Sequence, residues 1–376
     1  MKFVASSFEL LTHLQAISRV ISSKNTLPIL DNFLFNLVDH QLEITASDLE
    51  TTFITRMTIE NSSESGSIAI PSKILIDTLK EFSDQPLTFD ISLDNLSIVI
   101  ISANGQYNIV GQHGIDFPLV PSVKADKKHT LRINYEVLLN GINKTLFATA
   151  DDDLRPVMNG IFIELTASNL TFVASDAHKL VRYRRTDVKP AVNASFILPK
   201  KPATLLKNIL PKESNDILVE FDDKNAVFTL TNFTLVCRLV EGNYPSYNSV
   251  IPTDNPNAMT IDRLEFYNSL RRVSVFANQA SNLVKLTLSG NQITLSAQDL
   301  DFSISAYERL GCQYDGQDLE IGFKSIFLVE ILSNLSSGDV IFKLSDSSRA
   351  GIMVPTNSEN EGEDILMLLM PLMINL

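Results

Sequence analysis

The chain has 376 residues, of which 44% are hydrophobic and 20% charged, and its formal net charge is −13. This composition excludes a disordered chain, and the length predicts two or three domains rather than one. The acidic total argues against a simple nucleic-acid-binding domain, which is usually basic. No apolar run is long enough to span a membrane, since the longest candidate, 365–376, is short and contains Pro371.

Two features of the sequence bear on the compartment. The alternating pattern that begins at Met1 predicts a strand, and therefore no secretory signal. Cys237 and Cys312 are far apart and form neither a metal-ligand spacing nor a disulfide framework. Unpaired cysteines of this kind are typical of the reducing cytoplasm.

The first third of the chain predicts an alternation of strands and helices. A short strand at 2–5 is followed by an amphipathic helix, because apolar residues recur at helical spacing from Phe8 to Ile21. Paired strands around a tight turn at 38–41 come next, and a second helix begins just after Pro71. Alternating apolar residues between Phe89 and Ile100 then predict closing strands.

The same order of elements occurs three times. Asp48, Asp176 and Asp299 stand in similar pentapeptides, and the distances between them are 128 and 123 positions. Lysines repeat at the same distances near the start of the second helix of each unit: Lys73, Lys201 and Lys324. Units of this size match ordinary domains. The expected domains are 1–122, 129–252 and 258–376.

Each unit is predicted to contain about eight strands and two helices. Half-buried strands of this pattern favour antiparallel sheets with helices covering one face, so the fold class is α+β, in three tandem copies. The expected helices lie at 8–24, 72–82, 135–147, 199–212, 262–275 and 323–335. They contain 13 Lys or Arg and 7 Asp or Glu, a net charge of +6, which leaves −19 for the rest of the chain.

This distribution predicts a basic helical side and an acidic sheet side. The alternative is that lysines simply keep exposed helix faces in water. Charge position bears on binding and not on the fold, so it does not by itself decide between the two.

The candidates for catalytic chemistry are weak. The acidic run 151–153 has no histidine or further carboxylate at ligand spacing, so an acidic loop is favoured over a metal site. Ser175, Asp176 and His178 are adjacent in sequence, whereas the members of a catalytic triad converge from separate elements. Asp48 and Asp299 occupy the place of Asp176 without a histidine, so we expect these aspartates to be structural turn residues. Neither a zinc spacing, a phosphate-binding glycine loop nor a nucleophile elbow is present, and no cofactor or metal is expected.

Six segments closely resemble the bacterial sliding clamp, the beta subunit of the replicative DNA polymerase. They are 26–30, 45–50, 116–118, 155–160, 173–180 and 239–245. The resemblance covers the whole chain and implies a non-catalytic processivity factor in the cytoplasm. It implies a head-to-tail homodimer that closes as a six-domain ring around double-stranded DNA, with helices lining the hole. DNA would be held through weak phosphate contacts, without reading of base sequence.

The resemblance also implies particular site residues. The DNA-facing residues would be Lys24, Lys73, Lys80, Lys200 and Lys201. Asp152 departs from the family, which can carry a neutral DNA-contacting residue nearby. The dimer interface would be formed by Tyr107 and Ile109 on one side and by Val275 and Phe276 on the other. The alternative for these four apolar residues is an ordinary core.

A pocket for partner peptides is implied between the second and third domains. It would be formed by Met158, Ser175, Ala177, His178, Lys179, Leu180, Pro245, Val250, Met370, Pro371 and Leu372. A methionine-rich groove suits several peptides, and the implied partners are the polymerase, the clamp loader and repair proteins, through short linear motifs. Ser249, where the family often has a basic residue, and the tail 373–376 depart from the pattern.

Two other functions stay open at this point. The first is a metal-dependent hydrolase that uses the acidic run 151–153 and His178. The second is a monomeric β-rich adaptor that never closes into a ring.

Overall fold

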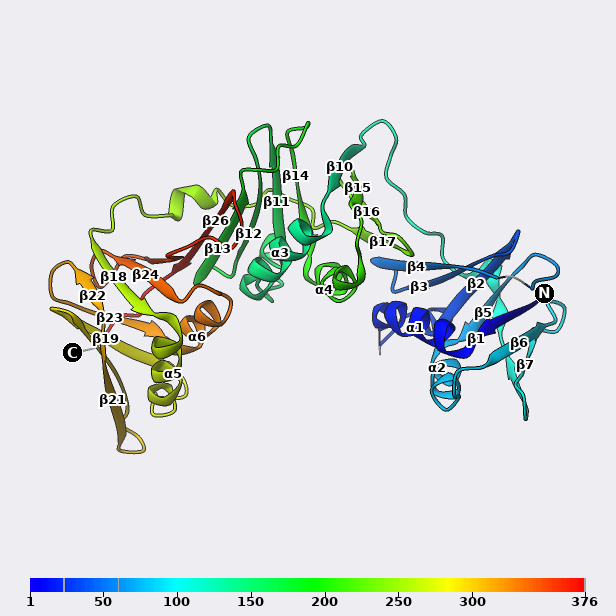
Figure 1. The fold of residues 1–376 in the computed structure, drawn as a ribbon, viewed down its shortest axis with the longest axis horizontal. Helices are drawn as coiled ribbons and strands as arrows, with labels where there is room; N and C mark the ends of the chain where they lie inside the picture. The colour runs from blue at the N-terminus through cyan, green and yellow to red at the C-terminus, as the bar shows by residue number, and fades with distance from the viewer. Residues whose placement is uncertain (23, 60, 375–376) are drawn as a thin grey trace. The chain divides into compact units, whose positions relative to one another are not determined.

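The structure is a computed structural model that describes residues 1–22, 24–59 and 61–374. It forms two compact units, Met1–Glu136 with Thr204–Leu239, and Val137–Ala203 with Val240–Leu376. Each unit therefore combines one terminal third of the chain with part of the middle third. In both units, antiparallel sheets carry helices on one face (Figure 1).

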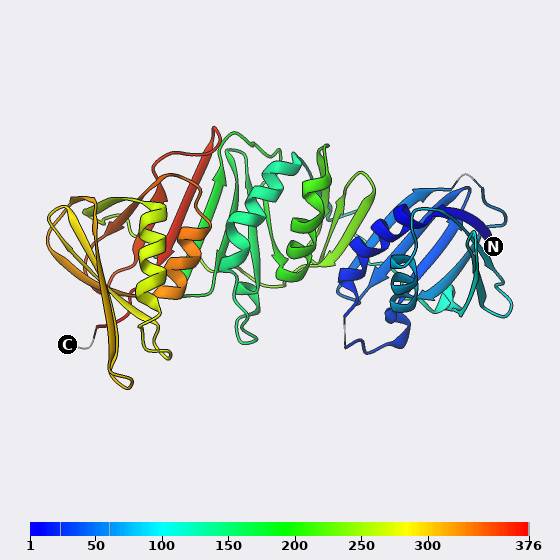
Figure 2. The ribbon, with the colours of Figure 1, turned by 60° about the horizontal axis from the view of Figure 1, so that its bottom comes forward.

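The first unit contains two sheets. One has the strand order β1-β6-β7-β8 and the other the order β10-β15-β16-β17-β4-β3-β2-β5-β9. The strands are β1 (Lys2–Ser6), β2 (Asn32–Val38), β3 (Gln41–Ser47), β4 (Thr51–Thr58), β5 (Gly66–Pro71), β6 (Pro86–Ile91), β7 (Ser97–Ile101), β8 (Gln106–Val110), β9 (Gln112–His113), β10 (His129–Ile133), β15 (Ile217–Phe221), β16 (Asn225–Thr229) and β17 (Phe233–Arg238). Helices α1 (Ser7–Ile17) and α2 (Ser72–Lys80) contact each other and lie side by side over the sheet (Figure 2).

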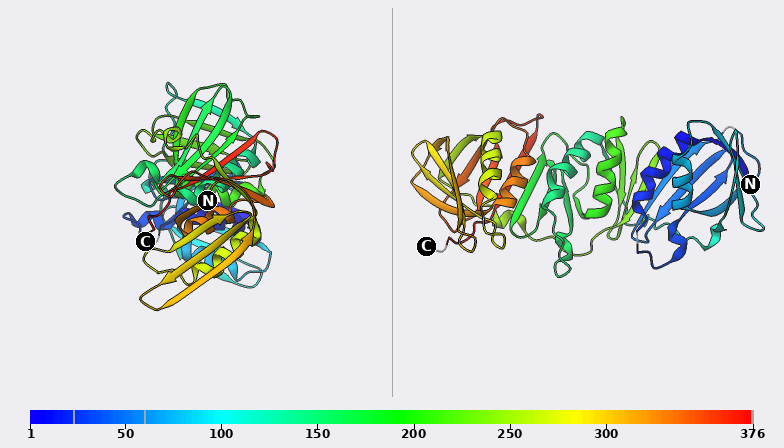
Figure 3. Two further views of the ribbon diagram at one scale, coloured as in Figure 1. Left: turned by 90° about the vertical axis from the view of Figure 1, so that its left-hand side faces the viewer. Right: turned by 90° about the horizontal axis from the view of Figure 1, so that it is seen from below.

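The second unit repeats this plan. Its sheets have the orders β14-β11-β12-β13-β26-β25-β24-β18-β22 and β21-β20-β19-β23. The strands are β11 (Gly160–Thr166), β12 (Asn169–Ser175), β13 (Lys179–Arg185), β14 (Ala194–Pro199), β18 (Asn257–Asp262), β19 (Leu283–Ser289), β20 (Gln292–Asp299), β21 (Ile304–Gly311), β22 (Gln313–Asp315), β23 (Leu319–Lys324), β24 (Asp339–Leu344), β25 (Gly351–Pro355) and β26 (Glu363–Leu369). Helices α5 (Arg263–Ser274) and α6 (Ser325–Ser333) pack together, as Figure 3 also shows.

The unit boundary passes through the two helices of the middle third, α3 (Tyr135–Thr145) and α4 (Lys200–Ile209). The three thirds thus run β1–β9 with α1 and α2, β10–β17 with α3 and α4, and β18–β26 with α5 and α6. This agrees with the predicted repeat and with the predicted α+β class.

Local sequence explains where the first helix of the outer thirds begins. The hydroxyl of Ser6 accepts a hydrogen bond from the Glu9 amide (3.1 Å), and the carboxylate of Asp262 accepts one from the Glu265 amide (2.7 Å). Each side chain satisfies an amide that the first helical turn leaves without a partner. The buried face of α1 consists of Leu10, Leu14 and Ile17, at helical spacing.

Two antiparallel strand pairs join neighbouring thirds of the chain. In the first unit β17 pairs with β4, and Leu235 lies opposite Phe53. In the second unit β13 pairs with β26, and Val181 lies opposite Met367. Both four-stranded sheets end in an edge strand, β8 in the first unit and β21 in the second.

Candidate functional site

The second unit contains a largely apolar cavity of about 270 Å³. It lies where the β12–β13 turn, the start of β13, the segment after Leu239 and the end of β26 come together. Its lining residues are Met158, Ser175, Ala177, Lys179, Leu180, Tyr244, Pro245, Ser246, Tyr247, Val250, Leu368 and Met370. A concave apolar site with few polar groups is the usual form of a binding pocket for a small ligand or a short peptide.

The β12–β13 turn forms one wall of this cavity and is fixed by side-chain hydrogen bonds. The Asp176 carboxylate accepts hydrogen bonds from the amides of His178 and Lys179, both at 2.9 Å. The Ser175 hydroxyl donates to the Lys179 carbonyl (2.8 Å) and accepts from the Ala177 amide (3.1 Å). Ala177 adopts a φ of +74°, which a residue with a Cβ rarely adopts, so the turn depends on these bonds.

The same turn occurs in each third of the chain. Asp48 accepts from the Thr51 amide at 2.7 Å, and Asp299 accepts from the Asp301 amide at 2.9 Å. The repeated aspartates are therefore turn residues, as the sequence predicted. A role for Asp176 in a catalytic triad would need a different orientation of its carboxylate.

Lys179 is buried in the wall of the cavity, and its charge is compensated. Its Nζ lies 2.8 Å from Asp176 Oδ2 and 3.0 Å from Glu330 Oε2, and 4.4 Å from the ring centroid of Phe327. Buried ammonium groups need such partners because loss of hydration is costly. Lys179 thus ties the turn to α6, and its aliphatic stem is what it offers to the cavity.

Two tyrosines form another part of the wall. The ring of Tyr244 stacks on Phe162 at 4.8 Å, and burial raises the pKa of its hydroxyl. The hydroxyl of Tyr247 donates a hydrogen bond to Glu164 Oε2 (2.7 Å). Both rings are held by β11, so the cavity has a rigid wall against which a ligand can pack.

The four apolar residues expected at a dimer interface lie at the surface. Tyr107 and Ile109 are on the edge strand β8, where Tyr107 is exposed and Ile109 half-buried. Val275 and Phe276 follow the end of α5 and are 74% and 37% exposed. Core packing therefore does not account for the exposed side chains of Tyr107, Val275 and Phe276.

The lysines expected to face DNA have different surroundings. Lys24, Lys73 and Lys80 are exposed in the first unit, and Lys80 lies 3.5 Å from Asp77. In the second unit Lys201 is exposed, whereas Lys200 Nζ lies 2.6 Å from Asp151 Oδ2. The interaction with Asp151 competes with a phosphate for Lys200.

The acidic run 151–153 has structural partners. Asp152 accepts hydrogen bonds from the Leu154 amide (2.9 Å) and from Arg155 Nε (2.8 Å), and the Arg155 hydrogen bond holds the pKa of Asp152 below its usual value. Within residues 1–22, 24–59 and 61–374, no group of three His, Cys, Asp or Glu side chains is placed to hold a metal ion. The run is an acidic loop, and the structure gives no support to the hydrolase alternative.

Comparison with known proteins accounts for the whole arrangement. The profile of the DNA polymerase III beta subunit N-terminal domain matches residues 1–121, that of the central domain matches 132–246, and that of the C-terminal domain matches 248–371. The chain belongs to the DNA polymerase III beta subunit family.

Named relatives agree with this assignment. The beta sliding clamp of Pseudomonas aeruginosa is 26% identical over 373 residues, covering 99% of this chain and 100% of the relative. That of a Synechocystis species is 29% identical over 378 residues, covering 94% and 96%. Among solved structures, the P. aeruginosa clamp bound to griselimycin matches with a TM-score of 0.92, at 25% identity, and the Bartonella birtlesii clamp bound to griselimycin with 0.91, at 27%; each comparison covers both chains completely.

The chain is therefore a DNA sliding clamp, a processivity factor of a DNA polymerase without catalysis of its own. The three-domain α+β fold predicted from the sequence is confirmed. Sliding clamps are generally dimers that act on DNA together with a polymerase. In the part of the chain that the structure describes, no helix is both long and apolar enough to cross a membrane.

Eight of the eleven residues expected in the clamp's peptide pocket line the apolar cavity. The other three, His178, Pro371 and Leu372, lie outside its lining. The His178 ring stacks on Phe327 at 5.9 Å, and the Leu372 amide donates to the Gly322 carbonyl (2.8 Å), which joins the chain after β26 to β23. Of the departing tail 373–376, the last two residues lie outside the described part.

Sequence reasoning missed Tyr244, Ser246, Tyr247 and Leu368. The aromatic spacing around Pro245 is a signal that would have pointed to Tyr244 and Tyr247. Leu368 is different, because it belongs to an apolar run on β26 whose members cannot be told apart without the sheet.

Proposed function

We propose that two copies of this chain close head to tail into a six-domain ring around duplex DNA, and that the ring tethers its partners through the apolar cavity. The observation that carries this proposal is the repeated pairing of strands between thirds of the chain. The fourth strand of the first third, β4, pairs with the last strand of the second, β17. The fourth strand of the second third, β13, pairs with the last strand of the third, β26.

This rule leaves one strand of each type without a partner. They are β8, which pairs with β7 as β17 pairs with β16 and β26 with β25, and β21, the fourth strand of the last third. An edge strand presents unpaired backbone groups and is a template for another chain. Because β8 and β21 differ, pairing them between copies gives a heterologous contact, and closure after two copies makes it a ring.

The two internal pairs also predict the register of this contact. Phe53, Val181 and Ala306 are equivalent, since each lies opposite the alanine of a repeated pentapeptide. Tyr107, Leu235 and Met367 are equivalent because they face Ile100, Phe228 and Met353. Since Leu235 lies opposite Phe53 and Met367 opposite Val181, Tyr107 of one copy should lie opposite Ala306 of the other.

Tyr107→Cys combined with Ala306→Cys is expected to form a disulfide between copies. Directly opposed residues of antiparallel strands have Cα atoms about 4.5–5.5 Å apart, within the range that a disulfide spans. The measurement is non-reducing electrophoresis after mild oxidation, in a chain that carries Cys312→Ser, because Cys312 is half-buried whereas Cys237 is buried. Asn108→Cys with Ala306→Cys is the matched control, since a shift by one residue turns the side chain to the other face. Equal or better cross-linking of the control would contradict the register.

The DNA-facing role of Lys24, Lys73, Lys80, Lys200 and Lys201 is part of the same proposal. Exposed lysines that exchange between phosphates hold DNA weakly and without sequence preference, which permits sliding. The acidic total charge is compatible with this, because the ring holds DNA topologically and needs no tight contact. Lys200 is expected to contribute least, because it already contacts Asp151.

Lys24→Gln combined with Lys73→Gln is expected to weaken binding of duplex DNA in a salt-dependent manner. Each lost phosphate contact lowers the slope of log K against log salt concentration by about one. The measurement is fluorescence anisotropy of labelled duplex at several low salt concentrations. Lys2→Gln is the control, because Lys2 pairs with Asp90 on the sheet. An unchanged slope in the double variant would remove these two lysines from the DNA interface.

The cavity is the proposed site for short apolar motifs of the replicative polymerase, the clamp loader and repair proteins. Its rigid tyrosine wall fixes one side, while Met158 and Met370 adapt to different side chains. The proposal places the protein in the cytoplasm, where bacterial DNA is replicated. The proposed domains remain 1–122, 129–252 and 258–376.

A further inference from the structure

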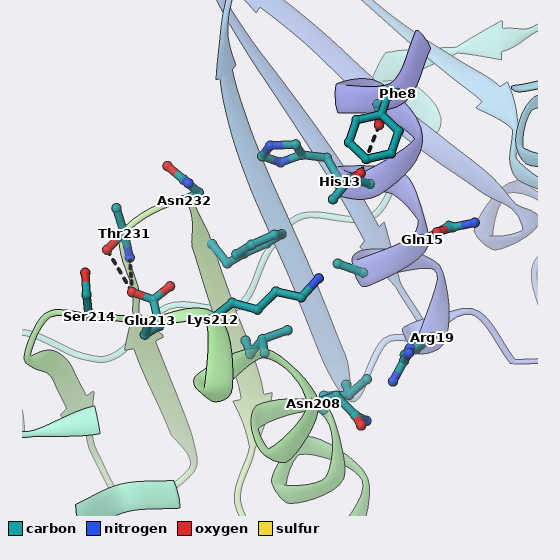
Figure 4. A pocket seen from close by; sticks show the side chains of 15 residues that line it. Phe8, His13, Gln15, Arg19, Asn208, Lys212, Glu213, Ser214, Thr231 and Asn232 are labelled. Atoms are coloured by element: carbon teal, nitrogen blue, oxygen red, sulfur yellow. Dashed lines mark hydrogen bonds between the residues drawn. The ribbon is translucent and has the colours of Figure 1, made fainter. Parts of the chain in front are cut away.

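The first unit contains a second, larger cavity of about 580 Å³, between α1 and the chain that follows α4 (Figure 4). Its lining residues are Phe8, Thr12, His13, Gln15, Ala16, Arg19, Leu205, Asn208, Ile209, Lys212, Glu213, Ser214, Thr231, Asn232 and Phe233. Polar and apolar groups are mixed here, in contrast to the cavity of the second unit. All of these residues belong to one unit of one chain, so the cavity does not depend on a ring.

The corresponding place in the second unit is filled. There the β25–β26 connection, 356–362, and the chain after α6 leave a space of only about 20 Å³. Lys144 closes it, because its Nζ donates to Ser336 Oγ (3.1 Å) and lies 3.2 Å from Glu359 Oε2. In the first unit the β16–β17 connection is short, 230–232, and Ala16 on α1 offers no such bridge. The β25–β26 connection therefore closes this place in the second unit, whereas the corresponding place in the first unit is open.

The lining of the open cavity carries two cationic side chains, Arg19 and Lys212, and one carboxylate, Glu213. Figure 4 shows Lys212 extending toward α1, with Arg19 on the far side of the cavity. Among the residues that the structure describes, neither Arg19 nor Lys212 forms an ion pair. The one acidic lining residue, Glu213, is engaged, since its carboxylate accepts hydrogen bonds from the amide (3.2 Å) and the hydroxyl (2.7 Å) of Thr231. An anion is the ligand that this charge favours.

Aromatic rings stand beside the two cations. The Phe8 side chain is 66% exposed, so its ring is accessible to a ligand. The His13 ring stacks on Phe233 at 5.5 Å, and its Nδ1 is hydrogen-bonded to the Thr55 hydroxyl, so the pair forms a fixed flat surface. Burial is the main cause that lowers the pKa of His13, so the ring is neutral near pH 7 and adds no repulsion toward Lys212.

We propose that this cavity binds a nucleotide unit, with its phosphate between Arg19 and Lys212 and its base against Phe8 and the His13–Phe233 surface. The side-chain amide of Asn232 supplies a donor and an acceptor for the edge of the base, and Asn208 supplies its Oδ1 as an acceptor, because its Nδ2 donates to the Thr204 carbonyl (2.8 Å). Cations combined with flat rings are the general means by which proteins hold unpaired nucleotides, whereas the lysines proposed to face DNA need only phosphates. The cavity volume is within the usual range for such ligands.

The test is binding of fluorescently labelled oligothymidylate, measured by anisotropy at low salt. Arg19→Gln combined with Lys212→Gln is expected to weaken binding at least tenfold, and Phe8→Ala by about tenfold. Lys207→Gln and Ile74→Ala are the matched controls, since Lys207 is exposed on α4 and Ile74 on α2 but neither lines the cavity. Both should bind like the unchanged protein.

Three further arms separate the alternatives. If thymidine monophosphate competes as well as the unlabelled oligonucleotide, the ligand of the cavity is a free nucleotide. If it competes only weakly, the ligand is a nucleotide within a DNA strand. Polyglutamate that competes equally well would overturn the proposal in favour of a general anion site, and so would unchanged binding in the Arg19 and Lys212 double variant. Phe276→Asp should retain the binding, because the cavity lies within one chain, so failure of the ring and failure of this site give different results.

Discussion

Phe276→Asp is expected to convert the dimeric protein into single chains at micromolar concentration. Phe276 is 37% exposed in one copy and lies next to Val275, which is 74% exposed. Burying such side chains against a partner contributes about 1.5–3 kcal/mol each, and a buried carboxylate without a partner costs several kcal/mol more. The measurement is light scattering at two concentrations, which gives the mass of one chain or of two.

The control for this variant is Val38→Asp, because Val38 is 46% exposed on the β2–β3 hairpin and has no part in the proposed dimer interface. It should stay dimeric. If the Phe276→Asp protein is still dimeric, Phe276 is not part of the dimer interface. A single-chain mass for the unchanged protein at micromolar concentration would contradict the ring and favour the monomeric adaptor instead.

An intact dimer interface is required for processivity because it closes the ring. A chain that cannot form the closed ring does not encircle DNA. The weak phosphate contacts of a few lysines are not enough to keep such a chain bound. The same variant should therefore fail to support long products in a reconstituted polymerase assay, although its apolar cavity is unchanged.

The repeat was predictable because its signal is local. The aspartate of each pentapeptide makes hydrogen bonds two and three residues ahead, so the motif is preserved wherever the turn is needed. Helix positions were also predictable from apolar spacing, but their ends were not. The expected helix 8–24 ends as α1 at Ile17, and a 3-10 turn follows at Ser18–Val20. The apolar spacing runs on past the helix because Val20 is buried and Ile21 half-buried, not because the helix continues.

The sites were less accessible from sequence than the fold. The apolar cavity is assembled from β12, β13, β26 and the segment around Pro245, so membership depends on which face of each strand is turned inward. No sequence motif predicted the cavity proposed to bind a nucleotide. The cavity is open because the β16–β17 connection is short, whereas the long β25–β26 connection fills the corresponding place in the second unit. The length of a loop is visible in the sequence, whereas the space it fills is not.

Met370→Lys is expected to abolish most binding of partner peptides while leaving the ring intact. Met370 lines the apolar cavity at the end of β26 and is exposed, so a lysine there is compatible with folding. Replacing its thioether contact removes about 1.5–3 kcal/mol of apolar burial from the complex, which corresponds to a Kd weaker by roughly 10- to 150-fold. The measurement is titration calorimetry with a short apolar peptide from the replicative polymerase.

Met373→Lys is the matched control, because Met373 is also exposed, lies three residues further along the chain and does not line the cavity. It should bind the peptide like the unchanged protein. Equal losses in both variants would mean that the segment after β26, and not the cavity, carries binding. Unchanged affinity in Met370→Lys, with the dimer retained, would show that partner peptides dock elsewhere, since a lysine at the mouth of so small an apolar site cannot be accommodated without cost.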